Sequence, residues 1–563
     1  MGGSRAGERR ILKRALHRGA PKISCPMAAR APCERMLEVC PSYDEFLKLA
    51  KHGNLIPLQT SILADRDTPV TVFERIRNHR YAFLLESVEH GSDTMQTGRY
   101  SFIGFDPEVV FEIRRPHVVR ETADGQRTTI DTTGTGVMPV LRDAMAPYKP
   151  VAMEGVPPFI GGLVGFLGYD MVREFERIPD GNPNDLGLPD GVMVLARDVI
   201  AIDHVRRRLT LIVNAHIADP ADPLSAYEKA VERLRALRDM VRRPAGAAAD
   251  VELFAPDQAE SPLPFDPATL VEHPVPRLEG DLPGLHLIRS SVSEAQFHSM
   301  VAKAREYILA GDAFQIVGSQ RFHTRFDCDP FDIYRSLRDV NPSPYMYYLQ
   351  FGELRLAGSS PEILVKLEGD TVRLRPIAGT RRRGVNAAED RALEQELLAD
   401  AKECAEHVML VDLGRNDVGR VSQPGTVHVD QLMIIERYSH VMHIVSNVLG
   451  KLRPECDAFD VLAASFPAGT VSGAPKIRAM EIIDEIEGTR RGPYAGTVCY
   501  FSFNGNLDSA ITIRTAILLG QHAFVQAGGG WVADSDPGAE YMETVNKARG
   551  VLRAIAQAQR GLD

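Results

Sequence analysis

The sequence predicts an α+β fold built largely from antiparallel strands, with amphipathic helices beside them. Two observations carry this prediction. From Tyr43 to about His216, short runs of strand-forming residues are bounded by Gly, Asp, Asn and Pro. Beyond Ser293, segments that alternate like half-buried antiparallel strands are interspersed with longer stretches of helical periodicity. The 563 residues are enough for two or more domains or for one large composite body.

In the first half, the clearest strands run over 81–85 and 192–196, and a helix is expected over 223–242. Apolar residues recur in that helix at helical spacing, at Ala230, Val231, Leu234, Leu237 and Val241. Segment 161–170 is rich in glycine but lacks a dinucleotide-binding fingerprint, so we expect its glycines to permit close packing.

In the second half, 371–375 and 511–515 alternate like strands, and helices are expected over about 387–410, 474–487 and 537–557. The last helix has a clear start signal, with Asp536 as N-cap and Pro537 at the first helical position. Its predicted apolar stripe is Val545, Ala548, Leu552 and Ile555, whereas Glu540, Glu543 and Lys547 share another face.

Composition divides the chain into four parts. Residues 1–42 are expected to be a disordered basic extension, because the first 35 hold nine Lys or Arg, two acids and no apolar secretory stretch. A transit peptide, or a start codon placed upstream of Met27 or Met36, is an alternative. An N-terminal region over 43–242 is followed by a linker or surface excursion over 243–285 and a second folded region over 286–557.

Overall composition excludes several classes of protein. The net charge of −10 argues against a general nucleic-acid binder, and the chain has no apolar run of about 18 residues for a membrane span. Its seven cysteines are scattered and form no C-x-x-C pair. This usage favours a reducing cytoplasm over a disulfide framework or a structural zinc site.

Two glutamate pairs suggest a metal site. Glu403 and Glu406, like Glu540 and Glu543, have i, i+3 spacing, which places both carboxylates on one face of a helix. Magnesium typically takes one or two protein carboxylates together with water and substrate oxygens. A solvated helix surface explains either pair equally well, so the pairs alone leave both interpretations open.

Four further features could bind an anion or act on it. Arg514 in a strand could clamp a carboxylate, and Gly528–Gly530 could bring backbone N–H groups to an anion. Ser472 could cap a helix that begins within 470–476. His443 lies in an apolar segment. A surface arginine, a tight turn, an ordinary helix cap and a structural histidine are the respective alternatives. Together, however, the features suit a small polyanionic substrate.

Several long motifs, in order, resemble the chorismate-utilising enzymes over about residues 48–555, and most closely their anthranilate synthase branch. The motifs begin at Pro376 (PIAGTR), Asp412 (DLGRND), Phe466 (FPAGTVSGAPK), Gly492 (GPYAG) and Gly538 (GAEYMETVNK). The resemblance implies a composite α/β/β/α body of two packed antiparallel sheets with helices outside. It also makes 286–557 the chorismate-binding catalytic region.

Two positions separate the activities of that family. Aminodeoxychorismate synthases carry a nucleophilic Lys where this chain has Ala378, which cannot act as a nucleophile. Isochorismate and salicylate synthases carry a water-activating Lys where this chain has Gln315. Glutamine can orient ammonia, so the resemblance implies a lyase that makes anthranilate and pyruvate at the start of tryptophan biosynthesis. Aminodeoxychorismate synthase is the alternative.

The resemblance also implies roles for individual residues. Glu406 and Glu543 would bind Mg²⁺ directly, with Glu403 and Glu540 supporting them through water. Glu362 would be the general acid at the leaving hydroxyl, and His443 would serve the second step as base or positioner. The remaining catalytic and substrate-binding positions are Gln315, Thr470, Gly379, Thr380, Tyr494, Arg514, Gly528, Gly529 and Gly530.

Regulation and partners follow from the same resemblance. Ser87 would meet the polar end of the inhibitor L-tryptophan, and Pro344, Tyr345 and Met346 would line its indole pocket. We find no Cys–His–Glu glutaminase arrangement, so ammonia is expected from a separate glutamine amidotransferase subunit or from free ammonium. A heterotetramer of two such chains and two glutaminases is expected.

Two rivals belong to other classes. A phosphate-transfer enzyme could use the glycine-rich segments, but the chain has no G-x-x-x-x-G-K-[ST] motif. A non-catalytic amino-acid sensor could keep the fold, but Glu362, Glu406, His443 and Glu543 are all present.

Overall fold

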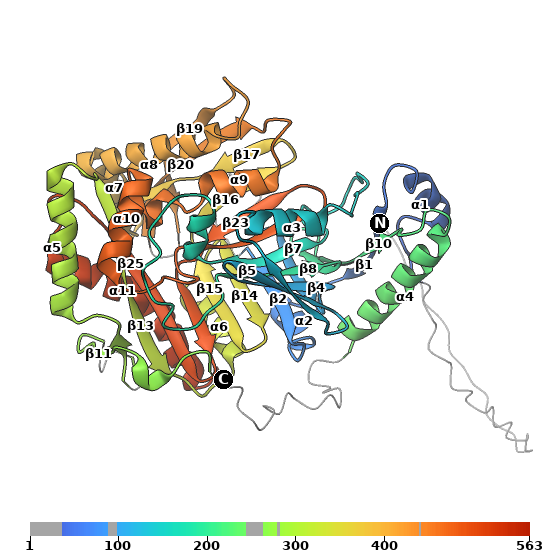
Figure 1. The fold of residues 1–563 in the computed structure, drawn as a ribbon, viewed down its shortest axis with the longest axis horizontal. Coiled ribbons are helices and arrows are strands. Elements are labelled where there is room, and N and C mark those ends of the chain that lie inside the picture. Colours follow the sequence, from blue (N-terminus) through green and yellow to red (C-terminus); the bar gives the residue numbers. More distant parts are fainter. Residues whose placement is uncertain are drawn as a thin grey trace, which may run out of the picture. The chain divides into compact units, whose positions relative to one another are not determined.

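A computed structural model describes residues 37–87, 98–243, 263–278, 282–285, 287–438 and 441–562, and all statements below concern these residues. The expected extension over 1–42 lies almost wholly outside them. Within them, the body from Val39 onward contains two large antiparallel sheets and the helices around them (Figure 1). The predicted fold class is therefore confirmed.

The first sheet joins strands from both halves of the chain. Its spatial order in the described residues is β1 (Leu55–Leu63), β10 (Arg208–His216), β9 (Asp198–Asp203), β3 (Tyr100–Phe105), β2 (Tyr81–Glu86), β14 (Tyr345–Phe351), β15 (Leu354–Ser360), β24 (Thr515–Leu519), β25 (His522–Trp531), β13 (Gln315–Arg325), β12 (Arg289–Ser290) and β11 (His273–Pro274). The short β21 (Gly473–Ala474) pairs with β13. The β2–β14 pair joins the two halves. Strand β11 comes from the predicted linker over 243–285, and the part of that linker over 244–262 lies outside the described residues.

The second sheet is also shared between the halves. Its described order is β18 (Ile377–Arg382), β20 (Val441–Lys451), β17 (Thr371–Leu374), β16 (Ile363–Glu368), β23 (Leu507–Ile511), β22 (Thr497–Ser502), β7 (Gly162–Leu167), β8 (Gly191–Ala196), β4 (Val109–Arg114), β5 (His117–Thr122) and β6 (Arg127–Asp131), with β19 (His428–Arg437) on β20. Phe159 packs between the sheets, with ring centroids 6.3 Å from Phe83 of β2 and 4.5 Å from Tyr500 of β22. The apolar core thus lies between the two inner faces.

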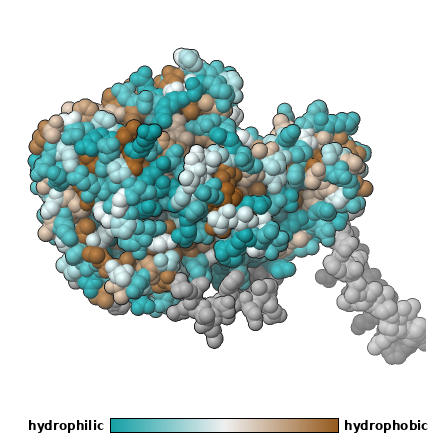
Figure 2. All heavy atoms as spheres, in the orientation of Figure 1, coloured by the Kyte–Doolittle hydropathy of each residue, from teal (hydrophilic) through white to brown (hydrophobic). Residues whose placement is uncertain are grey.

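Helices cover the outer faces. Beside the first sheet lie α5 (Glu294–Ala310), α6 (Pro330–Val340), α10 (Lys476–Glu487) and α11 (Pro537–Gln559), and beside the second lie α7 (Ala387–Ala399), α8 (Ala401–Gly419) and α9 (Ala458–Ser465) (Figure 1). The others are α1 (Tyr43–Leu49), α2 (Pro69–Glu74), α3 (Val137–Met145), α4 (Pro223–Val241) and three short turns, η1 (Tyr169–Glu174), η2 (Pro267–Thr269) and η3 (Gly469–Val471). The face drawn in Figure 2 is mostly hydrophilic, with apolar residues in small groups. None of the described helices is long and apolar enough to cross a membrane.

Most of the predicted elements are present. The helices expected over 223–242, 474–487 and 537–557 are α4, α10 and α11, and the predicted stripe of α11 is buried. The Asp536 side chain accepts a hydrogen bond from the Ala539 N–H at 2.8 Å, as expected of an N-cap. The helix expected over 387–410 is two helices, because Asp400 accepts bonds from the backbone of Lys402 and Glu403 and begins α8. The strands over 81–85, 192–196 and 371–375 are β2, β8 and β17.

The strand predicted over 511–515 is wrong. β23 ends at Ile511 and β24 begins at Thr515. Between them, the Thr512 backbone bonds to Ala495 and Gly496, and Arg514 has a φ of 52°. A left-handed residue cannot continue a strand. The alternation of apolar and polar residues carried no sign of this turn.

The expected close packing of segment 161–170 is confirmed. β7 lies between β22 and β8 in the middle of the second sheet. A Cβ on Gly165 would overlap the Val192 carbonyl oxygen of the neighbouring strand. Because that obstacle is backbone, the side chain could be accommodated only by moving a strand.

We therefore expect Gly165→Ala to lower the free energy of unfolding by about 1–3 kcal/mol, the usual cost of overpacking. Urea unfolding followed by circular dichroism measures the change. Gly181→Ala is the matched control, since a Cβ there meets no atom within 4 Å. Equal stability of the two variants would contradict the packing role of Gly165.

Candidate active site

The two glutamate pairs lie on different helices and are brought to one site by β13 and β25. Gln315, at the start of β13, donates from Nε2 to Glu406 Oε1 of α8 at 2.9 Å. A Cβ on Gly530 of β25 would lie 2.5 Å from that Nε2 atom, and one on Gly529 would lie 2.9 Å from Glu540 Oε2 of α11. The pairs are therefore neighbours, although 134 residues separate Glu406 from Glu540.

Burial and the charge of the neighbouring carboxylate raise the pKa of the first glutamate in each pair. Burial, and then the charge of Glu406, raises the pKa of Glu403, while burial and the charge of Glu543 raise that of Glu540. Glu540 Oε2 is buried and has no hydrogen-bond partner among the described residues. Lys547 Nζ lies 2.7 Å from Glu543 Oε1 and partly offsets the negative charge. The four carboxylates outnumber the cations paired with them in the described residues, Lys547 and Arg381, so the cluster fits a divalent cation.

No group of three or more His, Cys, Asp or Glu residues within the described ranges gathers closely enough to hold a metal ion by itself. The pairs could supply only part of a coordination shell, and the rest would come from water or a bound ligand. The predicted magnesium site thus stays a prediction, and its residues suit an ion whose shell is completed by substrate.

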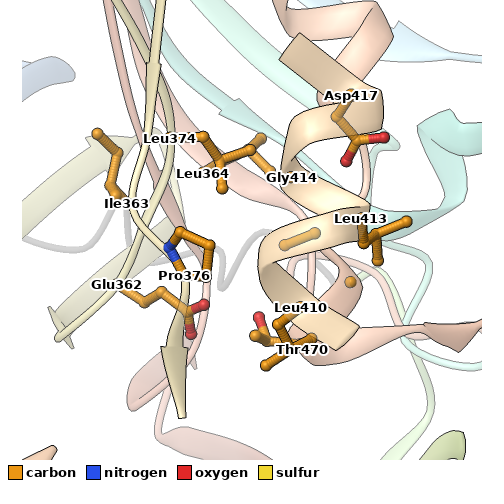
Figure 3. Close-up of a pocket in the computed structure, with 12 residues that line it drawn as sticks. Glu362, Ile363, Leu364, Leu374, Pro376, Leu410, Leu413, Gly414, Asp417 and Thr470 are labelled. Atoms are coloured by element: carbon orange, nitrogen blue, oxygen red, sulfur yellow. The ribbon is translucent and has the colours of Figure 1, made fainter. Parts of the chain in front are cut away.

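Glu362 is a buried carboxyl group beside a small cavity. It precedes β16 and faces Thr470 of η3 across a space also lined by leucines of α8 (Figure 3). Burial raises the pKa of Glu362 to about 8, and the Thr470 hydroxyl and the charge of Lys547 oppose this rise only in part. The Thr470 hydroxyl is buried without a hydrogen bond of normal geometry, so its contact with Glu362 is loose. At neutral pH Glu362 therefore holds a proton that it can donate.

Arg514 is a buried cation without an acidic partner. In the described residues it forms no salt bridge, and its guanidinium donates from Nη1 to the Lys547 carbonyl at 2.9 Å. Burial lowers the pKa of Arg514. A buried guanidinium without a counter-ion is a ready site for a carboxylate. Arg514 sits on a turn rather than in the expected strand, and its role as a carboxylate clamp stays a prediction.

The three glycines at 528–530 lie in β25 and pair with β13, so the expected turn-like anion nest is wrong. Extended residues in a ladder direct successive N–H groups to opposite sides instead of toward one anion. Their missing side chains matter for another reason. A Cβ on Gly528 would lie 2.6 Å from the Tyr494 hydroxyl, so the glycines leave room for Tyr494, Glu540 and Gln315.

His443 faces the loop of β18 that was predicted to line the substrate. Its Nδ1 atom lies 3.0 Å from the Gly379 carbonyl oxygen and 3.1 Å from the Thr380 hydroxyl. A carbonyl only accepts, so Nδ1 carries the proton and Nε2 has a free lone pair in the neutral ring. Burial is the main cause that lowers the pKa of His443 and keeps the ring neutral.

Ser472 does not cap the following helix. Pro475 occupies the N-cap position of α10, and the Ser472 hydroxyl donates to the Ala468 carbonyl at 2.9 Å. This bond closes the η3 turn, which contains Thr470. The prediction of a serine-capped helix N-terminus at this place is wrong.

The residues expected to bind a regulator also come together. Ser87 follows β2, and Met346 of β14 pairs with Glu86 at the end of β2. Ser87 Oγ is buried without a hydrogen-bond partner in the described part of the chain. Pro344 and Tyr345 precede Met346 on the neighbouring strand, so the four predicted positions flank one spot. Residues 88–97, which follow Ser87, are outside the described residues.

Sequence reasoning missed the contacts of two charged residues. Lys547 was placed on a helix face without a role, yet its Nζ donates to the Gly528 carbonyl at 2.8 Å and reaches Glu543. Asp417 lines the cavity of Glu362 and forms a buried ion pair of 2.8 Å with Lys476. The charged ends of the DLGRND and APK motifs were the available signal, but only the fold shows that they meet.

Known proteins resemble this chain over most of its length. The chorismate binding enzyme family matches residues 96–553. Anthranilate synthase component 1 of Acetivibrio thermocellus is 45% identical over 519 residues, covering 92% of this chain and 99% of that protein. That of Pseudomonas aeruginosa is 44% identical over 524 residues, again covering 92% and 99%.

Solved structures show the same fold. Anthranilate synthase component I from Streptococcus pneumoniae superposes with a TM-score of 0.67 at 37% identity, covering 83% of this chain and 94% of that one. The menaquinone-specific isochorismate synthase MenF of Escherichia coli has a TM-score of 0.61 at 18% identity, covering 91% and 98%. The second likeness concerns the fold alone.

The buried carboxyl group of Glu362 makes stability depend on pH. The folded protein keeps this proton up to about pH 8, whereas the ordinary pKa of an exposed glutamate is 4.5. The native state binds more protons in this window, so the free energy of unfolding falls as the pH rises through it. Glu362→Gln has no carboxyl group at this position, so its free energy of unfolding should not fall in this way. We expect the difference in free energy of unfolding, variant minus parent, to increase by roughly 3–5 kcal/mol between about pH 5 and about pH 9.

Urea unfolding of both proteins at each pH measures this difference. Glu368→Gln is the control, because Glu368 is exposed at the other end of the same strand. If Glu362→Gln and Glu368→Gln show the same pH dependence, then Glu362 is not held in its protonated form.

Proposed function

Because the chain belongs to the chorismate-binding enzymes, in their anthranilate synthase component 1 branch, we propose that it converts chorismate and ammonia to anthranilate and pyruvate. The observation that carries this proposal is the protonated Glu362 beside a small cavity, on a segment bonded to the one that holds Arg514. The Ile511 N–H donates to the Glu362 carbonyl at 3.0 Å, and the Ser359 N–H donates to the Arg514 carbonyl at 3.1 Å. A proton donor and a carboxylate clamp therefore share one scaffold.

The first step is addition and elimination. Ammonia forms a bond to ring C2, the double bond shifts, and the C4–O bond breaks. Glu362 gives its proton to the departing hydroxyl, which leaves as water. Gln315 lies beside the Glu406 carboxylate and can orient ammonia by hydrogen bonding, but it cannot deprotonate water. This property favours ammonia over water as the nucleophile.

The second step forms the aromatic ring. The C2 proton is lost, the C3–O bond breaks, and the enolpyruvyl group leaves and is protonated to pyruvate. The free Nε2 of His443 is suited to take the C2 proton, because Nδ1–H is held by the Gly379 carbonyl. Arg514 and Tyr494 bind the enolpyruvyl carboxylate, while Gly379 and Thr380 line the ring.

The glutamate pairs would hold one Mg²⁺ ion, with Glu406 and Glu543 as direct ligands and Glu403 and Glu540 behind water. When bound, the ion neutralises the ring carboxylate and stabilises charge that develops there. The residues fit this role because the four carboxylates outnumber the cations paired with them in the described residues, and substrate oxygens can complete the coordination shell. Glu540, with one oxygen bonded to Ser535 at 2.6 Å, suits the supporting position.

Ammonia and regulation involve partners. A separate glutamine amidotransferase subunit supplies ammonia in a heterotetramer of two chains of each kind, as the designation component 1 of the relatives suggests. L-Tryptophan binds between Ser87 and the segment Pro344–Met346 and inhibits by favouring a state with weaker chorismate affinity. The five described cysteines are all free, which supports a reducing cytoplasm.

The direct test is the purified chain with chorismate, Mg²⁺ and an ammonium salt. We expect fluorescent anthranilate and one pyruvate for each chorismate consumed. Glu362→Gln should lower kcat by about 10²–10⁴-fold, the usual contribution of a general acid.

Aminodeoxychorismate as product would replace this proposal by the alternative of an aminodeoxychorismate synthase. Isochorismate would indicate that water is the nucleophile. A protein that binds tryptophan but consumes no chorismate would be a sensor.

The metal assignment predicts an order of effects. Glu543→Gln should raise the Mg²⁺ concentration needed for half-maximal rate more than Glu540→Gln, for which an effect of about 10–100-fold is usual when a residue supports a metal through its ligands. Binding of Mg²⁺ with chorismate present, measured by calorimetry, should weaken in the same order. The reverse order in both measurements would make Glu540 the direct ligand.

A further inference from the structure

A buried serine links the proposed regulatory segment to the catalytic segment. Ser359, near the end of β15, is 0% exposed. Its hydroxyl donates to the Asn341 carbonyl, accepts from Asn341 Nδ2 at 3.1 Å and shares a bond of 2.9 Å with the Ser343 hydroxyl. One donor and two acceptor sites are the full capacity of a hydroxyl group. Ser359 therefore has no spare partner with which to adjust if Asn341 or Ser343 moves.

The backbone of Ser359 continues this connection to the substrate clamp. Its N–H donates to the Arg514 carbonyl at 3.1 Å, at the point where β15 and β24 begin to pair at Gly358 and Thr515. Arg514 has a left-handed φ of 52°, which costs free energy and persists only where neighbours hold it. A second bond in the same place joins the Tyr347 and Thr515 hydroxyls at 2.6 Å.

The order of strands in the first sheet places the proposed regulatory residues and Arg514 close to Ser359. β2, β14, β15 and β24 are consecutive neighbours in the first sheet. Met346 pairs with Glu86 on one side and with Ser359 on the other. The regulatory residues at the ends of β2 and β14 are thus two strands or fewer from Ser359, and Arg514 is bonded to it directly.

We propose that Ser359 is a positioning residue that joins the segment Asn341–Met346 to Arg514 and so couples the two sites. The regulatory part rests on the proposed function. A ligand between Ser87 and Met346 displaces Asn341 and Ser343 from β15. Because the Ser359 hydroxyl is saturated, this displacement reaches its backbone and the Arg514 carbonyl. The guanidinium then loses the position in which it binds the substrate carboxylate, and chorismate affinity falls.

Ser359→Ala tests the coupling. We expect KM for chorismate to rise about tenfold, within the usual range of coupling between sites, while kcat changes little. L-Tryptophan should still bind, as measured by calorimetry, but should no longer raise KM. A defect of packing alone would instead lower stability without separating binding of tryptophan from inhibition.

Three further variants complete the test. Ser336→Ala is the matched control, because Ser336 lies on α6 beside β14 and β15 and its buried hydroxyl has no hydrogen-bond partner among the described residues. It should leave KM and inhibition unchanged. Ser87→Ala should lose tryptophan binding, as measured by calorimetry. Ser343→Ala removes a single hydrogen bond to Ser359 and should weaken inhibition by tryptophan, as Ser359→Ala does. This variant keeps the test decisive if Ser359→Ala does not fold.

The outcomes separate this inference from the proposed function. If the parent protein makes anthranilate and Ser359→Ala keeps the parent's KM and inhibition, Ser359 has no positioning role. If the parent makes anthranilate but tryptophan never inhibits it, the coupling is overturned while the catalytic proposal stands. If no anthranilate forms, the catalytic proposal itself fails.

Discussion

The site depends on ionisable groups that the fold partly removes from water. Glu362 and Arg514 lie on bonded segments at the meeting of the two sheets, the first kept neutral by burial and the second left charged without an acidic partner. A buried charge without a partner is costly, and the body around it must be stable enough to hold it. That cost is recovered when a dianionic substrate arrives. The same residues would be ordinary on a surface.

Each catalytic group is placed by a different element, so the geometry depends on strand packing. Gln315 begins β13, the glycines of β25 leave space beside it, and α8 and α11 present the glutamates from the outside. Small shifts of these elements would close the gaps that the glycines provide. The dense core between the sheets resists such shifts, since well-packed interiors deform little.

Neighbouring strands also give the proposed regulation a physical route. Antiparallel partners are bonded along their length, so a change at the end of β14 reaches β15 without passing through a flexible loop. Only a few bonds separate Met346 from the Arg514 backbone. The coupling therefore requires displacement of one saturated hydroxyl group and no rearrangement of the fold.

By itself the sequence determined the type of most elements and the core stripe of α11, and it proposed the site residues, because periodicity, cap residues and long ordered motifs are local signals. It did not determine the turn at Arg514 or the break between two helices at Asp400. Nor did it determine that the glycines at 528–530 form a strand or that the Ser472 hydroxyl bonds within a turn. Each of these features depends on the backbone around it in the folded chain. The neutral state of Glu362 and the unpartnered charge of Arg514 were also decided by tertiary structure. Burial, which sets both, belongs to the packed sheets and not to the residue or its neighbours in sequence.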